Sequence, residues 1–142
     1  MSALAAFAPP APVRAKFRRM ASVLLVDRIE PCLDFWVDRL GFEVRLRVEG
    51  DLGLDFAILG RDEVEVVYRT LESIHQSSPG LVDGEAHQPW VVLYVEVDDL
   101  DAVLPRLEGV EVVVPLRESI VGAREILVRE PSGRIVALTS HE

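Results

Sequence analysis

The 142-residue chain is long enough for one domain, or for two small halves that share a core. Its single cysteine excludes an internal disulfide framework and a multi-cysteine zinc site, and no apolar run approaches the roughly 18 residues that a membrane span needs. Residues 1–19 contain four basic residues and no acid, so the remainder has 24 acidic and 11 basic residues, a net charge of −13. Such a body repels phosphate backbones, which argues against nucleic acid as a partner, but it tolerates cationic ligands.

The N-terminal segment, residues 1–19, is rich in alanine and proline and ends in basic residues. A secretory signal has its basic residues before the apolar stretch, and here the order is reversed. An arginine-rich, acid-poor leader can also be a transit peptide, but we favour a tail or an arm that lies on a neighbouring subunit. The lone cysteine fits a reducing compartment, so a cytoplasmic location is expected.

The first half of the chain begins with a buried strand at residues 21–26. Asp27 and Glu30 then have the spacing of a helix N-cap with a reciprocal carboxylate. Apolar residues recur at three- and four-residue steps up to Gly41, which predicts an amphipathic helix that ends there. Three strands are expected next at residues 42–48, 54–59 and 64–68, followed by a short helix at 70–75.

The second half repeats this order after a Ser-, Pro-, Gly- and Asp-rich linker at residues 76–88. The run Asp98-Asp99-Leu100-Asp101 is expected to cap a helix that reaches about Leu107. The strands of this half are expected at residues 91–97, 110–115, 123–128 and 135–138. The predicted organisation is therefore a tail or arm at residues 1–19, a first module at 20–75, the linker at 76–88 and a second module at 89–142.

Internal duplication is the simplest account of this order. The pair Val26-Asp27 matches Val97-Asp98 71 residues later, each pair ending a strand and starting a helix. Both helices end at a glycine. We therefore predict an α+β fold of two tandem βαβββ modules.

Three motifs on this frame resemble a known superfamily. They are the helix pattern Leu33, Phe35-Trp36 and Leu40-Gly41-Phe42, the run Tyr94 to Asp101, and the run Arg124 to Arg134. Together they are similar to the vicinal oxygen chelate superfamily, also called the glyoxalase/bleomycin-resistance/dioxygenase group, over residues 21–139. The resemblance implies curled mixed sheets around a cleft, and homodimers whose subunits share clefts.

In metal-using members of this superfamily, four ligands, usually His or Glu, come from the first and last strands of each module. The corresponding residues here are Ala21, Glu65, Val92 and Ala137. Only Glu65 has a lone pair to offer, whereas a catalytic metal usually needs about three protein ligands. We therefore expect no metal, no cofactor and no catalytic residue. The histidines are expected to lie in solvent in the linker or at the terminus, at His75, His87 and His141.

Most candidates for ligand binding are residues that strand alternation places on a cleft face, and Trp90, which opens the second module, and Arg124, in the third motif, are added by their positions. The predicted ligand-binding residues are Glu65, Val67, Arg69, Trp90, Tyr94, Glu96 and Arg124. Glu65 and Glu96 are the strongest of these candidates. A carboxylate that is buried without a partner is energetically costly, and a cationic ligand would offset that cost.

Each of these assignments has a structural alternative. Glu65 could instead pair with Arg69 or Arg124, or face solvent. Trp90 could stack on a planar ligand or cover the end of a sheet, and Tyr94 could contact ligand or core. Arg124 could be an ion-pair partner or an anion contact. By contrast, Trp36 and Cys32 are expected to be core residues.

The predicted function is that of a metal-free binding protein of the bleomycin-resistance type. Its ligand would be a small antibiotic or metabolite, and the acidic side chains allow that molecule to be a cation. The alternatives are a lyase, isomerase or dioxygenase of the same fold, with non-standard metal ligands or none, and an interaction domain whose cleft is collapsed.

Overall fold

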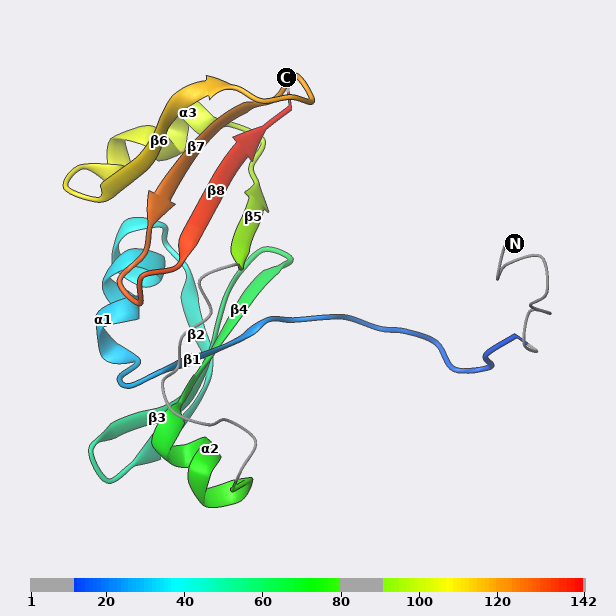
Figure 1. The fold of residues 1–142 in the computed structure, drawn as a ribbon, viewed down its shortest axis with the longest axis vertical. Helices are drawn as coiled ribbons and strands as arrows, with labels where there is room; N and C mark the ends of the chain where they lie inside the picture. The colour runs from blue at the N-terminus through cyan, green and yellow to red at the C-terminus, as the bar shows by residue number, and fades with distance from the viewer. Residues whose placement is uncertain (1–11, 80–90, 142) are drawn as a thin grey trace, which may run out of the picture.

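The computed structural model describes residues 12–79 and 91–141, and the predicted linker and Trp90 lie largely or wholly outside these ranges. The elements of the first half are β1 (Val23–Val26), α1 (Glu30–Leu33), the π-helical turn η1 (Asp34–Arg39), β2 (Glu43–Gly50), β3 (Gly53–Arg61), β4 (Val64–Thr70) and α2 (Leu71–Ser77) (Figure 1). Those of the second half are β5 (Val92–Glu96), α3 (Leu100–Val103), the 3-10 turn η2 (Leu104–Leu107), β6 (Glu111–Glu118), β7 (Arg124–Arg129) and β8 (Ile135–Ser140).

Each half forms its own four-stranded mixed sheet. The strand orders are β1-β4-β3-β2 and β5-β8-β7-β6. In both sheets the first strand of the module lies parallel to the last, and the other neighbours are antiparallel. The predicted duplication and the α+β class are therefore confirmed, and the two sheets do not close into a barrel. In the described ranges, no helix is both long and apolar enough to cross a membrane.

The start of α1 differs from the sequence prediction. The N-cap residue is Ile29, which provides no side-chain cap, so the expected capping by Asp27 with Glu30 is wrong. The helix starts too late for Asp27 to cap it, and the Glu30 carboxylate instead accepts a 2.7 Å hydrogen bond from the backbone N–H of Leu54. That bond holds the pKa of Glu30 below its usual range. In the second module, Asp99 caps α3 by accepting from the N–H of Ala102.

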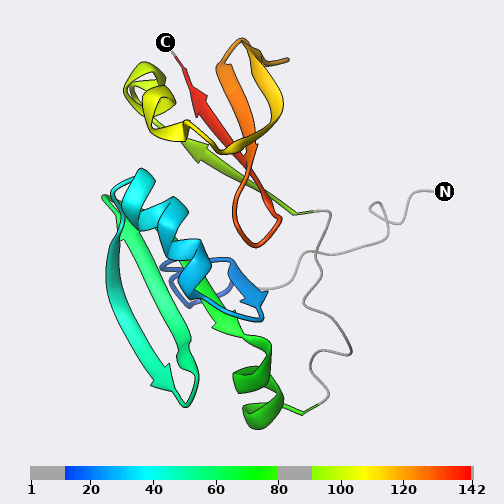
Figure 2. The same ribbon diagram turned by 90° about the vertical axis from the view of Figure 1, so that its left-hand side faces the viewer.

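One hydrophobic core unites the helix-bearing faces of both sheets. α1 and η1 run along one face of the first sheet (Figure 2). Trp36, on η1, is buried as expected, in the same cluster as Leu24 and Leu59 of the first module and Leu100 and Leu138 of the second. Alternate residues of the strands, such as Val136 and Leu138 on β8 and Val66 and Tyr68 on β4, belong to this core, so each sheet turns one face to it and the other away from it.

A buried polar contact crosses this core between the modules. The hydroxyl of Tyr68 on β4 donates to Glu130 Oε2 at 2.7 Å and accepts from the indole N–H of Trp36 at 2.7 Å. Glu130 lies in the β7–β8 turn with 2% exposure, and its other oxygen accepts from the N–H of Arg134 and the hydroxyl of Ser132. A buried carboxylate is tolerated only when its lone pairs are satisfied, and here three donors satisfy them.

A second joint connects the ends of the two helical segments. Arg106, at the end of η2, donates to the carbonyl oxygens of Arg39 and Asp38, both at 2.8 Å. Arg39, at the end of η1, donates in return to the carbonyl oxygens of Arg106 and Glu108. Carbonyls at a helix C-terminus lack partners and carry partial negative charge, so each arginine neutralises the helix end of the other module.

Substituting Tyr68 by Phe is expected to destabilise the protein by about 1–3 kcal/mol, because it leaves Glu130 and the Trp36 N–H short of a partner inside the core. The measurement is the free energy of unfolding in urea. Tyr94→Phe is the matched control, since Tyr94 is 57% exposed, and a change within about 0.5 kcal/mol is expected there. Equal stabilities for the two variants would contradict a structural role for the Tyr68–Glu130 contact.

The pKa of Cys32 predicts loss of stability in alkali. Burial, reinforced by the Glu130 carboxylate, raises the pKa of the Cys32 thiol to about 12, and burial also raises the pKa of Tyr68. The unfolded chain releases the thiol proton at about pH 8.5 while the folded protein keeps it, so the stabilisation present below that pH is lost as the pH rises.

Between pH 7 and pH 10 we expect the free energy of unfolding to fall by about 1–2 kcal/mol through this thiol. Urea titrations at both pH values measure it, and Cys32→Ala should lose most of the decline. The same decline in both proteins would show that other groups cause it.

Candidate functional site

The faces of the two sheets that turn away from the core are open and carry many apolar side chains. Strand register places Glu65, Val67 and Arg69 on the open face of the first sheet, and Tyr94 and Glu96 on that of the second. The exposed apolar residues that register places on these faces are Val23, Leu46, Val48, Val92 and Tyr94. Such surface is what a ligand pocket or a subunit interface uses.

A pocket of about 240 Å³ lies where the two open faces meet the end of the N-terminal segment. Its lining includes Ala21, Glu65, Val92 and Tyr94, so β4, β5 and the residues before β1 all contribute. Three of the four positions that correspond to metal ligands thus converge here. The fourth, Ala137, lies on β8 beside Tyr94 and is not part of the lining.

Glu65 is the charged centre of this pocket, and two arginines hold it. Its Oε1 pairs with the guanidinium of Arg19, and its Oε2 accepts from Arg45 Nη1 at 3.2 Å. Arg45 reaches the carboxylate across Gly60, the residue opposite Glu65 on β3, where an added Cβ would lie 2.4 Å from the guanidinium. A second bond, from Arg45 Nη2 to the carbonyl oxygen of Asp62 at 2.8 Å, fixes the arginine in place.

These two partners of Glu65 were not identified from the sequence. Arg19 was assigned to the tail, and the expected alternatives were Arg69 and Arg124. Strand alternation could have raised Arg45 as a candidate, but which residue faces Glu65 depends on the β2–β3 register, which is irregular after Val44. The contact of Arg19 follows only from the path of the chain before β1.

The residues at this corner do not fit a divalent metal. The side chains of Ala21, Val92 and Ala137 have no donor atom, and the Glu65 carboxylate is already paired with two guanidinium groups. Within residues 12–79 and 91–141, no group of three or more His, Cys, Asp and Glu side chains is arranged to hold a metal ion.

The other predicted site residues are divided between different surroundings. Register places Val67 on the open face of the first sheet, and its side chain is buried there. Arg69 donates to Ser73 Oγ at 3.0 Å and Ser77 Oγ at 2.7 Å, which ties β4 to α2. Tyr94 lines the same pocket as Glu65, and its hydroxyl is 3.4 Å from His141 Nε2.

Arg124 lies on the other side of the second sheet. It alternates with the open-face residue Glu125 and shares a face with the core residues Ile126 and Val128. It pairs with Asp101 of α3 at 3.0 Å, and this guanidinium lowers the pKa of the Asp101 carboxyl. The structure therefore favours the ion-pair alternative for Arg124.

Glu96 lines a separate, larger hollow of about 690 Å³ between the modules. The hollow lies beside the helix ends joined by Arg39 and Arg106, and the guanidinium groups of both arginines are bound to backbone carbonyls. Glu65 and Glu96 are therefore not part of one pocket in the chain.

Comparisons with a family model and with known proteins show what this chain is similar to. The family model for the Glyoxalase/Bleomycin resistance protein/Dioxygenase superfamily matches residues 18–138. A search of curated proteins found no match.

Several solved structures share the fold. TioX from Micromonospora sp. ML1 is 24% identical, with a TM-score of 0.69 over 89% of this chain and 100% of the other. The bleomycin-binding protein from bleomycin-producing Streptomyces verticillus, solved in complex with copper(II)-bleomycin, is 28% identical with a TM-score of 0.61 over 90% and 99%. A lactoylglutathione lyase from Agrobacterium tumefaciens is 18% identical with a TM-score of 0.66 over 94% and 96%. The duplicated fold and the family match together show that the chain belongs to the Glyoxalase/Bleomycin resistance protein/Dioxygenase superfamily.

Proposed function

We propose that the protein binds a small cationic molecule without a metal, with Glu65 as the anionic anchor. The observation that carries this proposal is which side chains occupy the positions that correspond to metal ligands. Three of the four positions that correspond to metal ligands are aliphatic, and the fourth, Glu65, is bound by guanidinium groups. A carboxylate that already binds organic cations is suited to recognise a ligand of the same kind.

The walls of the pocket indicate the rest of the ligand. Val92 and Tyr94 are apolar or aromatic, and Trp36 contributes part of the floor. An apolar pocket with one charged anchor favours an amphiphilic cation, in which a planar or aliphatic body carries an amidinium, guanidinium or ammonium group. The net charge of −9 adds a long-range attraction for such molecules.

The similarity to the bleomycin-binding protein supports a binding role, because that relative is seen with a bound antibiotic complex. The alternative is a lyase, isomerase or dioxygenase, and the relative named as a lactoylglutathione lyase shows that enzymes share the fold. Metal analysis separates the two, since a stoichiometric Zn, Fe, Mn or Ni that survives dialysis would favour the enzyme.

We also propose a homodimer in the cytoplasm. The exposed apolar residues of both open faces support association, because a monomer would leave them in water. In a dimer, the open face of one module could be covered by a partner, which would enlarge the pocket around Glu65.

The experiment that tests the proposal is a titration with hexylguanidinium, followed by the fluorescence of Trp36 in the pocket wall. Glu65→Gln is expected to weaken binding at least about ten-fold, because a charged hydrogen bond contributes roughly 1.5–3 kcal/mol. Hexylurea, which is neutral and of the same shape, should bind weakly to both proteins.

Glu72→Gln is the matched control, since it removes one negative charge from the exposed surface of α2. It should leave the affinity within about two-fold of the unaltered protein, as expected for a distant screened charge. No binding of hexylguanidinium at millimolar concentration, or equal binding by Glu65→Gln, would contradict the proposed role of Glu65.

The dimer is tested by sedimentation equilibrium. Leu46→Lys places a charge among apolar residues of the open face of the first sheet and should raise the dimer dissociation constant at least about ten-fold, because the charge would be buried without a partner. Leu52→Lys is the control at the β2–β3 turn. A monomer at all concentrations, or equal effects of the two lysines, would exclude an interface on this face.

A further inference from the structure

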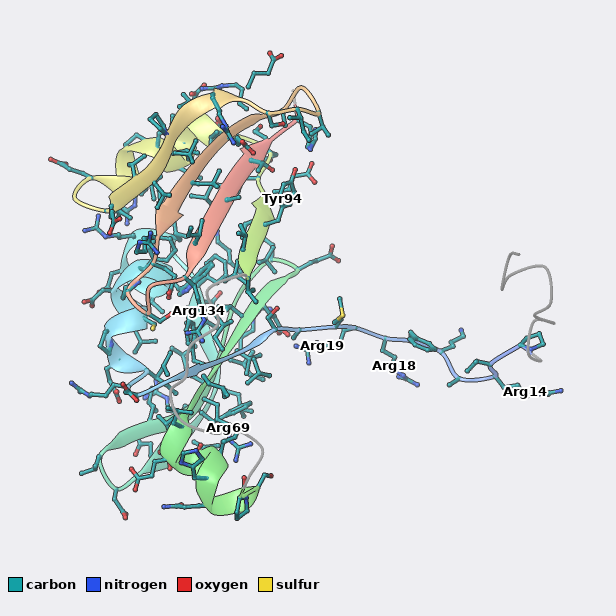
Figure 3. All side chains as sticks on the ribbon, in the orientation of Figure 1. Arg14, Arg18, Arg19, Arg69, Tyr94 and Arg134 are labelled. Atoms are coloured by element: carbon teal, nitrogen blue, oxygen red, sulfur yellow. The ribbon has the colours of Figure 1, made fainter. Side chains whose placement is uncertain are left out.

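The segment before β1 leaves the body as an extended arm with Arg14, Arg18 and Arg19 along it, and Arg19 lies nearest to the sheets (Figure 3). Val13, Phe17 and Met20 of this arm are exposed to solvent at 72%, 90% and 97%. Its apolar side chains are therefore not packed on the chain. What attaches the arm to the pocket is the ion pair between Arg19 and Glu65.

The two arginines on Glu65 are held unequally. Arg45 has a second bond to the Asp62 carbonyl, and 36% of its side chain is exposed. Arg19 is 57% exposed, and Glu65 is its only hydrogen-bond or ion-pair partner among residues 12–79 and 91–141. An exposed ion pair contributes about 0–1 kcal/mol, so the Arg19 contact is weak enough to open and the Arg45 contact is the more permanent one.

Both oxygens of Glu65 already accept from guanidinium groups. Oε2 belongs to Arg45 and Oε1 to Arg19. The residues next to Arg19 in the chain, Met20 and Ala21, also line the pocket. A ligand cation that approaches Oε1 from within the pocket therefore competes with the Arg19 guanidinium, because a third cation at this single carboxylate would be repelled by the two already there.

We infer that Arg19 is an internal competitor at the ligand site: the arm places its own guanidinium on Glu65, and a cationic ligand displaces it. This inference rests on the proposed function, because it assigns regulation to the same carboxylate. Binding is then coupled to release of the arm. The apparent dissociation constant equals the intrinsic one divided by the fraction of molecules whose arm is detached.

Arg19→Ala is expected to tighten hexylguanidinium binding about three- to five-fold, the factor that corresponds to an exposed ion pair of up to about 1 kcal/mol. The gain should shrink in 0.5 M NaCl, because salt weakens the Arg19–Glu65 pair in the unaltered protein. Arg18→Ala is the matched control: it removes the same charge from the neighbouring position, and Arg18 has no hydrogen bond or ion pair with any described residue. Its affinity should equal that of the unaltered protein.

A second measurement follows the arm itself. In ¹⁵N-labelled protein, the backbone amides of residues 15–20 should become more mobile on addition of hexylguanidinium, and Glu65→Gln should show the mobile arm without ligand. A tightened Arg19→Ala variant together with ligand-induced release would support the inference.

If Arg19→Ala binds no more tightly than the unaltered protein, while Glu65→Gln still loses binding, the competition is excluded and the proposed function remains. If neither the unaltered protein nor Arg19→Ala binds the probe, the proposed function fails and the inference fails with it.

Discussion

The buried contact between Tyr68 and Glu130 is the constraint that orients the whole molecule. It requires the β7–β8 turn of one module to stand against β4 of the other, in a region that excludes water. Because a buried carboxylate without its donors is strongly unfavourable, relative sliding of the modules is penalised at this point. The reciprocal arginines at the helix ends fix a second point. With both helix-bearing faces packed in this joint, the opposite faces of the sheets are left exposed, beside the hollow between the modules that Glu96 lines.

The chemistry of the pocket follows from what those open faces retain. At the corner where relatives with a metal place four donors, this chain keeps one carboxylate and surrounds it with guanidinium groups in place of an ion. The positive charge beside Glu65 is thus supplied by two arginine side chains and not by an ion held in coordinate bonds. Gly60 is part of this exchange, because the close approach of Arg45 requires a residue without a side chain at that point.

Much of the fold could be predicted from local patterns. Hydrophobic periodicity located the strands and helices, the turn at Gly41 has the positive φ of 76° that favours glycine, and the placement of Trp36 and Cys32 in the core is confirmed. The cap at Asp27 failed because a tertiary partner, the N–H of Leu54, competes for the Glu30 carboxylate. The run Arg124 to Arg134, which contains Glu130, served only as a family motif, since nothing local indicates that the Glu130 carboxylate enters the core of the other module.

The site was harder to predict, because its contacts also join residues that are far apart in the sequence. Glu65 could be identified by its position in the last strand of the first module, but its partners are 46 and 20 residues away in sequence. For Arg124, alternation could have corrected the prediction: its neighbours Ile126 and Val128 are apolar and face the core, which places Arg124 on the same side, away from Tyr94. Contacts that depend on strand register or on the path of a terminal segment are not determined by periodicity.

The joint between the modules has a consequence for engineering. Its side chains come from both modules: Trp36, Arg39 and Tyr68 from the first, and Arg106 and Glu130 from the second. The peptide connection between the modules therefore contributes to the joint mainly by keeping the two modules at a high local concentration. Two separately expressed halves would each present an apolar helix face and an unsatisfied polar group that only the other half can cover. Fused to other proteins, such halves would form a split reporter whose reassembly reads out the proximity of its carriers.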